Sequence, residues 1–339
     1  THPEYFFARS PEQGLIHPDN LYILLSHIKC AAFELPFADG EEFGVSTTGE
    51  ILEFLAEQGV LRHVGGRWYW TAEHFPAEDV SLRSAAQDNF VIIDRTEKPR
   101  VIGEVDRFSA PLLIHEEAIY LHESAQYQVE ELDYAEKKAY VRRVEVDYYT
   151  DAQLAVTIRP LEVFATTEET DLTRAHGEIL VSAKATSFKK IKFHTHENVG
   201  WGKIHLPEEE MHTTAYWFSL AEPLQRRFSE PELEAALAGL SQVLRNVAPL
   251  YLMCDPRDIG AVAQVRSPFT RQPTLFIYDS VPGGVGFGER LFHLHSELLA
   301  AARQVVAACP CAGGCPACVG PQAQLGPAVK ATVLALLEE

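Results

Sequence analysis

Four of the chain's six cysteines lie within ten residues near its C-terminal end, and this cluster constrains the fold more than any other feature. The segment ACPCAGGCPAC places them at Cys309, Cys311, Cys315 and Cys318. Four thiolates on one loop can surround a tetrahedral metal ion, and the two glycines and two prolines of the segment bend the backbone so that the sulfurs converge. The spacing predicts a structural zinc site, because four protein ligands leave no coordination position open for water.

Two other interpretations of this array exist. An iron–sulfur cluster is also held by four cysteines, so the spacing alone does not fix the metal, and we expect zinc. Four unrelated free cysteines are disfavoured, because so many reactive thiols on one loop would be costly. The remaining pair, Cys30 and Cys254, is isolated. This layout suits a metal in a reducing cytosol better than a disulfide framework, and so predicts a cytoplasmic protein.

The first quarter of the chain has the element order of a winged helix. Apolar residues at helical spacing predict a helix over 17–34 and another over 48–58, with Asp19 or Asn20 capping the first. Two alternating runs around Gly65-Gly66 then predict a tight hairpin. One interpretation is a wing that presents Arg62, Arg67, Trp68 and Trp70 to nucleic acid. The other is a protein-binding or structural winged helix whose tryptophans lie in the core. The charge of the segment favours this alternative, because residues 1–90 contain 5 basic and 14 acidic residues.

The middle of the chain predicts strands of an antiparallel sheet or small barrel. Short runs rich in β-branched and aromatic residues occur at 90–94, 100–105, 118–122, 126–132, 138–146, 154–164 and 178–193. Basic residues gather here at Arg142, Arg143, Lys184, Lys189, Lys190 and Lys192. They form either a local basic face or solvated strand edges. Four histidines between 194 and 212 are interpreted as core or surface residues, because histidine binds metal only where several donors converge.

The last third predicts an α/β domain with helices over 230–252, 286–308 and 327–337 and strands within 263–280. The zinc site would join the last two helices. The loop in YDSVPGGVGFGER (278–290) is either an anion site or a tight strand-to-helix turn. No Walker A, H-E-x-x-H, G-x-S-x-G or deaminase signature occurs, so the sequence offers no catalytic centre.

Length and charge limit the remaining function classes. A chain of 339 residues favours two or three domains. Its net charge of -19 argues against coating nucleic acid or an anionic membrane by bulk attraction. No apolar run reaches about 18 residues, so we expect no membrane span. The first residues contain neither an initiating Met nor a basic segment typical of a secretory signal, and they predict a piece cut from a longer chain.

Four blocks in joint order resemble the region C-terminal to the motor in MrfA-type superfamily 2 DNA helicases, which are repair enzymes linked to mitomycin-type lesions. The blocks are PDNLYILLSHIKCAAFELPF (18–37), VDYYT (146–150), KKIKFHTHENVGWGKIHLPEEEMHTTAYWF (189–218) and YDSVPGGVGFGERLF with CPCAGGCPACVGP (278–321). The resemblance implies two ATPase lobes upstream of this chain and carries the zinc ligands onto the four cysteines. The chain departs from the family at PQAQLGPAV, where a further Cys-Gly-Asn-type stretch would be expected. Because this segment contains no cysteine, a site with four ligands requires Cys309.

These observations predict an α+β multidomain chain: a winged helix over 1–86, an antiparallel β-rich sheet or small barrel over 87–165, and an α/β zinc-binding domain over 166–339. The expected function is guiding single-stranded DNA for an ATP-dependent repair helicase, with the ATPase lobes of the same polypeptide as partner and no membrane contact. The alternative is a protein-interaction scaffold with a structural zinc and no DNA contact. The candidate DNA-contacting residues are Arg62, Arg67, Trp68, Trp70, Arg142, Arg143, Lys189, Lys190 and Lys192.

Overall fold

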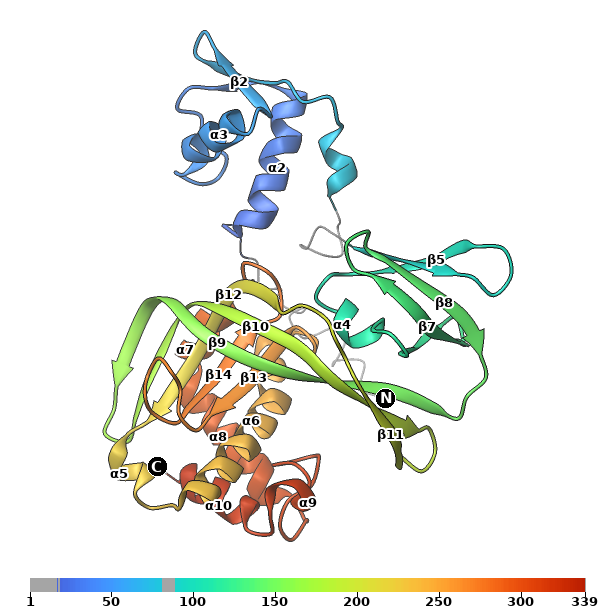
Figure 1. Ribbon diagram of the computed structural model, residues 1–339. Coiled ribbons are helices and arrows are strands. Elements are labelled where there is room, and N and C mark those ends of the chain that lie inside the picture. Colours follow the sequence, from blue (N-terminus) through green and yellow to red (C-terminus); the bar gives the residue numbers. More distant parts are fainter. Residues whose placement is uncertain (1–16, 18, 81–88, 339) are drawn as a thin grey trace, which may run out of the picture. The chain divides into compact units, whose positions relative to one another are not determined.

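The computed structural model describes residues 17, 19–80 and 89–338 (Figure 1). These residues form two compact units. The N-terminal unit comprises 19–157 and 182–210, and the C-terminal unit comprises His17, 158–181 and 211–338. The ends of the winged-helix region drawn from the sequence, 1–16 and 81–86, lie outside the described residues. Within the described residues, no helix is both long and apolar enough to cross a membrane.

The winged helix opens the N-terminal unit and has the expected order of elements. They are α2 (Leu21–Glu34), β1 (Phe37–Ala38), α3 (Thr48–Glu57), β2 (Leu61–Val64), β3 (Arg67–Trp70) and the 3-10 turn η1 (Pro76–Asp79). Asn20 caps α2, because its side-chain oxygen accepts from the backbone N–H groups of Tyr22 and Ile23. Gly65 and Gly66 both have positive φ, as the tight turn between β2 and β3 requires. Ile28, Leu52 and Leu55 fill the core between the two helices and the three-stranded sheet β1-β3-β2.

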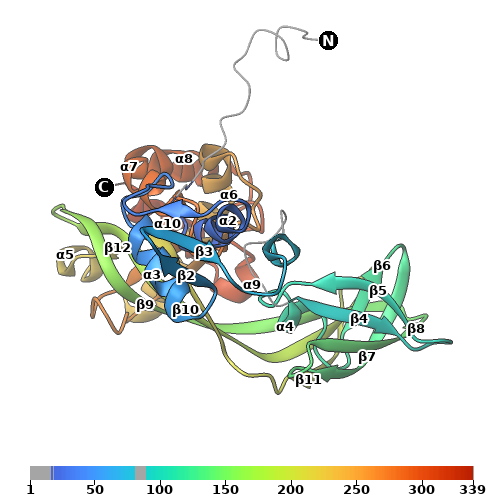
Figure 2. The same ribbon diagram turned by 90° about the horizontal axis from the view of Figure 1, so that it is seen from above.

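A five-stranded sheet follows in the same unit (Figure 2). Its strand order is β5-β4-β8-β7-β6. Its elements are β4 (Phe90–Asp94), β5 (Arg100–Val105), the short helix α4 (Ala110–Leu113), β6 (Ile119–His122), β7 (Ala125–Asp133) and β8 (Lys138–Val144). The sheet is mostly antiparallel, as predicted, but β4 and β8 pair in parallel. Three strands separate β4 from β8 along the chain, so the connection is long enough for a parallel neighbour.

Two long paired strands, β9 (Tyr148–Glu168) and β10 (Leu172–Lys192), contribute residues to both units. The later part of β10 pairs antiparallel with β11 (Asn198–Lys203) in the N-terminal unit. Phe188 of this hairpin is fully buried and packs with Ala185 and Ile204 in a small core of its own.

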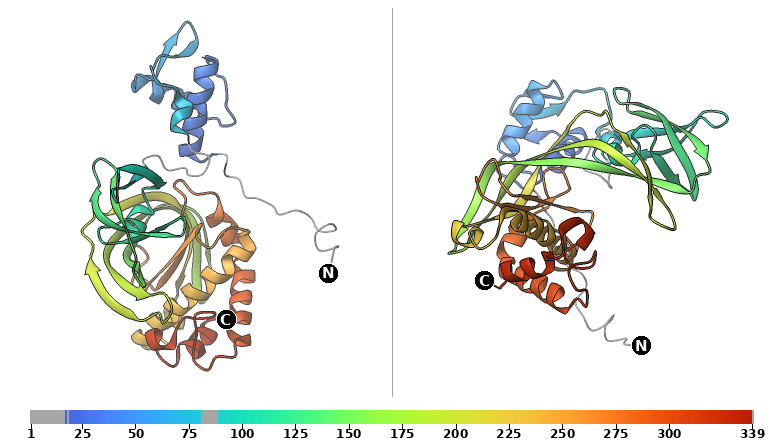
Figure 3. Two further views of the ribbon diagram at one scale, coloured as in Figure 1. Left: turned by 90° about the vertical axis from the view of Figure 1, so that its right-hand side faces the viewer. Right: turned by 60° about the horizontal axis from the view of Figure 1, so that its bottom comes forward.

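The C-terminal unit packs helices against a sheet. Besides the parts of β9 and β10 that belong to it, its strands are β12 (Glu209–Leu220), β13 (Ile259–Gln264) and β14 (Thr274–Asp279). Its helices are α5 (Glu222–Gln225), α6 (Glu230–Leu252), α7 (Phe287–His293), α8 (His295–Ala308), α9 (Gln322–Leu325) and α10 (Val329–Leu336). Strand β14 lies between β12 and β13 and is antiparallel to both. One apolar core joins β12 and β14 to α6, α7, α8 and α10, whose orange-to-red ribbons lie together in Figure 3. Gly239 of α6 lets α10 approach closely, since a Cβ there would lie 3.0 Å from Val329.

Two sequence expectations for this unit were wrong in detail. The helix expected over 286–308 is two helices, because Leu294 leaves the helical conformation and His295 turns its ring to the hydroxyl of buried Tyr216. The strand expected over 263–269 ends at Gln264. Beyond Gln264, the N–H of Ser267 donates to the carbonyl of Gln272 and closes a turn. The strand cannot continue through Pro268, because proline has no N–H to donate to a neighbouring strand.

Candidate metal centre and nucleic-acid interface

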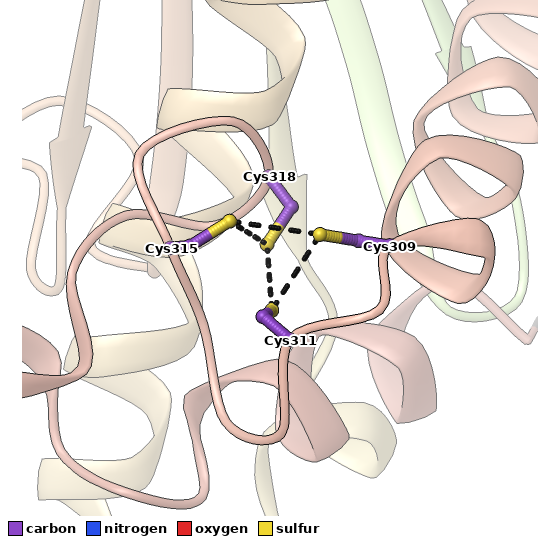
Figure 4. A group of neighbouring side chains, drawn as sticks. All are labelled: Cys309, Cys311, Cys315 and Cys318. Carbon is purple, nitrogen blue, oxygen red and sulfur yellow. Dashed lines mark hydrogen bonds between the residues drawn. The ribbon is translucent and has the colours of Figure 1, made fainter.

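The four clustered cysteines point at one another in the C-terminal unit (Figure 4). Cys309 ends α8, and the other three lie on the loop between α8 and α9. Their ligand atoms all lie within 4.8 Å of one another. Four of the sulfur–sulfur separations are 3.5 or 3.6 Å: 309 to 311, 309 to 315, 311 to 318 and 315 to 318. The loop therefore brings together all the residues that the sequence assigns to the metal.

This arrangement matches the requirements of tetrahedral thiolate coordination. Four sulfurs placed about 2.3 Å from a zinc ion lie roughly 3.8 Å apart along the edges of a regular tetrahedron. The observed separations are slightly shorter, so a zinc ion would need only a small expansion of the cluster. The buried thiol Cys318 belongs to the apolar core, and Cys309, Cys311 and Cys315 pack against that core. A metal bound here would hold the loop to the helices.

Lys330 of α10 is a supporting residue that the sequence analysis missed. Its Nζ donates to the carbonyl oxygens of Cys309, at 2.6 Å, and Cys311, at 2.8 Å. The ammonium thus ties α10 to the backbone of the cysteine loop. The backbone N–H of Cys311 and the neighbouring thiols lower the pKa of Cys309, whereas burial and the neighbouring thiols raise the pKa of Cys311. The sequence signal was the position of Lys330, the only Lys or Arg between 304 and the end of the chain.

The wing residues separate into two groups. The side chains of Arg62 and Arg67 are exposed on β2 and β3, whereas both tryptophans are half-buried and pack against the winged-helix core. Trp68 stacks on His63, with ring centroids 4.2 Å apart. Trp70 meets Phe33 edge-on and donates its indole N–H to the carbonyl of Ala72. The structure therefore leaves the two arginines accessible, and it commits both indoles to internal contacts.

The second helix of the winged helix, α3, has an acidic outer face. It contains Glu50, Glu53 and Glu57 and neither Lys nor Arg. All three carboxylates are exposed, and so is the Phe54 ring, at 49%. This face would repel the phosphates of a DNA duplex.

The basic residues of the middle region are also divided. Arg142 donates to Glu130 at 2.7 Å, while Arg143 is exposed. In the hairpin of β10 and β11, Lys190 lies 3.2 Å from Glu117, and Lys192 lies 4.0 Å from Asp147. Lys189 is exposed, and no ion pair of its side chain occurs in the described part of the chain. Alternation along β10 sends Lys189 and Lys190 to opposite faces, so the lysines do not form one patch.

Trp201 on β11 is the second functional candidate that the sequence analysis missed. It is 69% exposed and lies directly opposite Lys189 in the antiparallel register. Lys203, two residues further along β11, is also exposed. The alternation of Gly200, Trp201, Gly202 and Lys203 was the available sequence signal, because it places both glycines on one face of a strand and the indole and ammonium on the other.

The glycine-rich loop between β14 and α7 is a structural turn. The carboxyl group of Asp279 occupies the position at which a bound anion would accept hydrogen bonds from the loop. Asp279 is fully buried at the end of β14. Burial raises the pKa of this carboxyl to about 6, although the hydroxyl of Thr214 and the backbone N–H groups of Val285, Phe287 and Gly288 lower it. The donors that could have held a phosphate thus face Asp279. The histidines at 194, 196, 205 and 212 form no metal-ligating cluster with any described residue.

Two family profiles match separate parts of the chain. The profile of the MrfA Zn-binding domain matches residues 240–319, which include all four clustered cysteines. The profile of the winged helix domain of the ATP-dependent helicase HRQ1 matches residues 16–85.

Similarity to whole proteins extends over nearly the entire chain. The chain is 49% identical to the uncharacterized ATP-dependent helicase YprA of Bacillus subtilis over 340 residues, covering 100% of this chain and 45% of YprA. It is 24% identical to the ATP-dependent helicase HRQ1 of Saccharomyces cerevisiae, covering 93% of this chain and 31% of HRQ1. The crystal structure of the DUF1998 helicase MrfA matches with a TM-score of 0.68 and 43% identity over 99% of this chain and 46% of that one. The structure of MrfA bound to DNA matches with a TM-score of 0.58 and 50% identity over 99% and 45%. The chain thus spans less than half the length of these relatives.

Proposed function

Because the chain matches the profiles of the MrfA Zn-binding domain and of the HRQ1 winged helix domain, we propose that it is the DNA-guiding accessory region of an ATP-dependent helicase that acts in DNA repair. Single-stranded DNA is its partner, the cytoplasm its compartment, and the ATPase lobes belong to a part of the polypeptide outside these 339 residues. The observation that supports this most is the 50% identity, over 99% of the chain, to a helicase whose structure was determined with DNA.

The proposal assigns no ATP hydrolysis to this chain. The sequence contains no Walker A motif, and the glycine-rich turn between β14 and α7 encloses Asp279. The chain alone should bind single-stranded DNA with an affinity that falls steeply as salt rises, because each neutralised phosphate releases counterions. Fluorescence anisotropy with a labelled oligothymidylate tests this. Absence of binding at low salt, or ATP turnover by the purified chain, contradicts the proposal.

We assign the zinc ligands of the domain to Cys309, Cys311, Cys315 and Cys318. Their sulfur separations fit a tetrahedral thiolate site, and they lie where the Zn-binding profile matches. Zinc bound by all four would stabilise the loop between α8 and α10, because binding free energy at a structural site is also folding free energy.

Elemental analysis tests the assignment. The purified chain should contain about one zinc per molecule. Cys315→Ser should lose the zinc and a large part of the stability of the C-terminal unit. Cys254→Ser is the matched control, because Cys254 is half-buried in the same unit but outside the cluster. Iron in place of zinc, or full zinc content in Cys315→Ser, would contradict the assignment.

A second candidate function concerns the winged helix alone. The acidic outer face of α3, with Phe54 at its centre, favours docking of a protein surface that carries basic and apolar groups over reading of a DNA groove. In this alternative the winged helix is a scaffold module. Replacing Glu50 and Glu53 by Gln should then leave the DNA affinity of the chain unchanged, whereas a gain in DNA affinity, the result expected if this face lies against DNA, would exclude it.

A further inference from the structure

The hairpin of residues 187–203, formed by the end of β10 and by β11, carries an exposed indole beside two exposed lysines. We propose that this β10–β11 hairpin is a stacking site for the unpaired bases of single-stranded DNA, with Trp201 as the stacking ring and Lys189 and Lys203 as phosphate contacts. The inference rests on the proposed function and names the residues that contact the strand.

The antiparallel register brings these three side chains onto one face. Lys189 is the partner of Trp201, and Ser187 is the partner of Lys203. Directly opposite residues on antiparallel strands project to the same side, and residues two apart on one strand do likewise. The face therefore presents the indole between two ammonium groups, one across the hairpin and one further along β11.

The opposite face of the hairpin is fixed to the protein, which holds Trp201 outward. Phe188 is fully buried and its ring lies over Gly202, where any Cβ would collide with it. The ring of buried His115 lies against Phe188, with centroids 4.6 Å apart. Ile204 is buried as well. A rotation of the hairpin that buried Trp201 would have to expose Phe188 and Ile204, at a cost of roughly their full burial.

The local charge favours an anionic ligand in a chain that is acidic overall. Residues 184–205 contain five lysines and a single acidic residue, Glu197. Lys190 and Lys192 on this hairpin have acidic neighbours in Glu117 and Asp147. For Lys189 and Lys203, no ion pair occurs with any residue that the structure describes. Lys189 and Lys203, the two lysines on the face of Trp201, are therefore available to a ligand.

An exposed ring flanked by cations suits a nucleic-acid strand better than a protein surface or a duplex. Bases stack on aromatic side chains without sequence preference, and the cations follow the backbone. In a duplex the base faces are already stacked on one another, so the indole would find no partner. The contrast within the chain is Phe54, an exposed ring surrounded by carboxylates.

Trp201→Ala in the 339-residue chain tests the inference. Its affinity for a fluorescein-labelled oligothymidylate of roughly 16 nucleotides should fall by roughly 5- to 150-fold, and Trp201→Phe should restore part of the loss. Phe54→Ala is the matched control, an exposed aromatic side chain with acidic neighbours, and should bind like the parent chain. Because Trp201 is 69% exposed, the thermal midpoint of Trp201→Ala should remain close to that of the parent.

The outcomes separate the two proposals. If the parent chain binds the oligonucleotide and Trp201→Ala binds equally well, the inference is overturned while the proposed function stands. If the parent chain binds no single strand at low salt, the proposed function fails and the inference with it. A Trp201→Ala loss as large for a blunt duplex as for the single strand would also overturn the inference, because stacking requires unpaired bases.

Discussion

The winged helix and the β10–β11 hairpin both contain tryptophans next to cations, but they present them differently. The exposed aromatic ring of the wing is Tyr69, which lies opposite Arg62 in the register of β2 and β3. In the winged helix, Trp68 and Trp70 pack against the core beside exposed arginines, and the neighbouring helix α3 carries three carboxylates. In the hairpin, Trp201 projects outward beside Lys189 and Lys203, while Phe188 is the buried ring. Strand alternation therefore turns Trp68 and Trp70 toward the core of the winged helix and turns Trp201 outward.

The largest expected effect is on stability. Trp70→Ala should lower the free energy of unfolding of the winged helix by about 3 kcal/mol, because it removes a half-buried ring that contacts Phe33 and a hydrogen bond to Ala72. Trp201→Ala should change it by less than about 0.5 kcal/mol, as expected for an exposed site. Urea unfolding followed by circular dichroism measures both. Equal losses would mean that the two indoles have similar environments.

The next effect concerns charge. Lys189→Gln with Lys203→Gln should weaken single-strand binding and reduce the slope of log affinity against log salt by about 1.4, because two phosphate contacts are lost. The matched pair Arg62→Gln with Arg67→Gln removes two exposed cations from the wing and should leave the slope nearly unchanged. Salt titrations of both variants compare the two regions directly. A larger change in the arginine pair would return the DNA contact to the wing.

A smaller effect distinguishes neighbouring lysines on one strand. Lys190→Met should leave DNA affinity almost unchanged and should cost about 0.5 kcal/mol of stability, because Lys190 pairs with Glu117 in a partly exposed contact. Lys189→Met should show the reverse, with weaker DNA binding and unchanged stability. Thermal unfolding and anisotropy on the two variants provide the readouts. DNA affinity that responds equally to both would show that the two lysines share a face.

A further effect is a pH dependence of the packing beneath the hairpin. Burial lowers the pKa of His115, whose ring supports Phe188. Below about pH 6.5, His115 therefore binds a proton more readily in the unfolded chain than in the folded one. Acidification should lower the stability of the packing beneath the hairpin, on the order of 1 kcal/mol for each unit by which the pKa is lowered. Hydrogen exchange of β10 and β11 amides at pH 7 and pH 5, corrected for intrinsic rates, measures this. His115→Gln should remove the dependence, and its persistence in that variant would assign it elsewhere.

Much of the fold follows from local patterns in the sequence. The capping of α2 by Asn20, the turn at Gly65-Gly66 and the convergence of four cysteines all depend on residues close together in the chain. The parallel pairing of β4 with β8 and the contact of Lys330 with the cysteine loop depend on residues that meet only after folding. Trp201 is intermediate, because its glycine neighbours are visible in the sequence but the ring that selects the inner face, Phe188, lies on another strand.

The most direct test of the account is photochemical crosslinking of the chain to a single strand that contains 5-iodouracil, which reacts with aromatic residues stacked on the base. Mass spectrometry of the digested complex then identifies the crosslinked residue. The account predicts a crosslink at Trp201, lost in Trp201→Ala and retained in Trp70→Phe. A dominant crosslink at Trp68, Tyr69 or Trp70 would contradict it and would assign the strand to the wing.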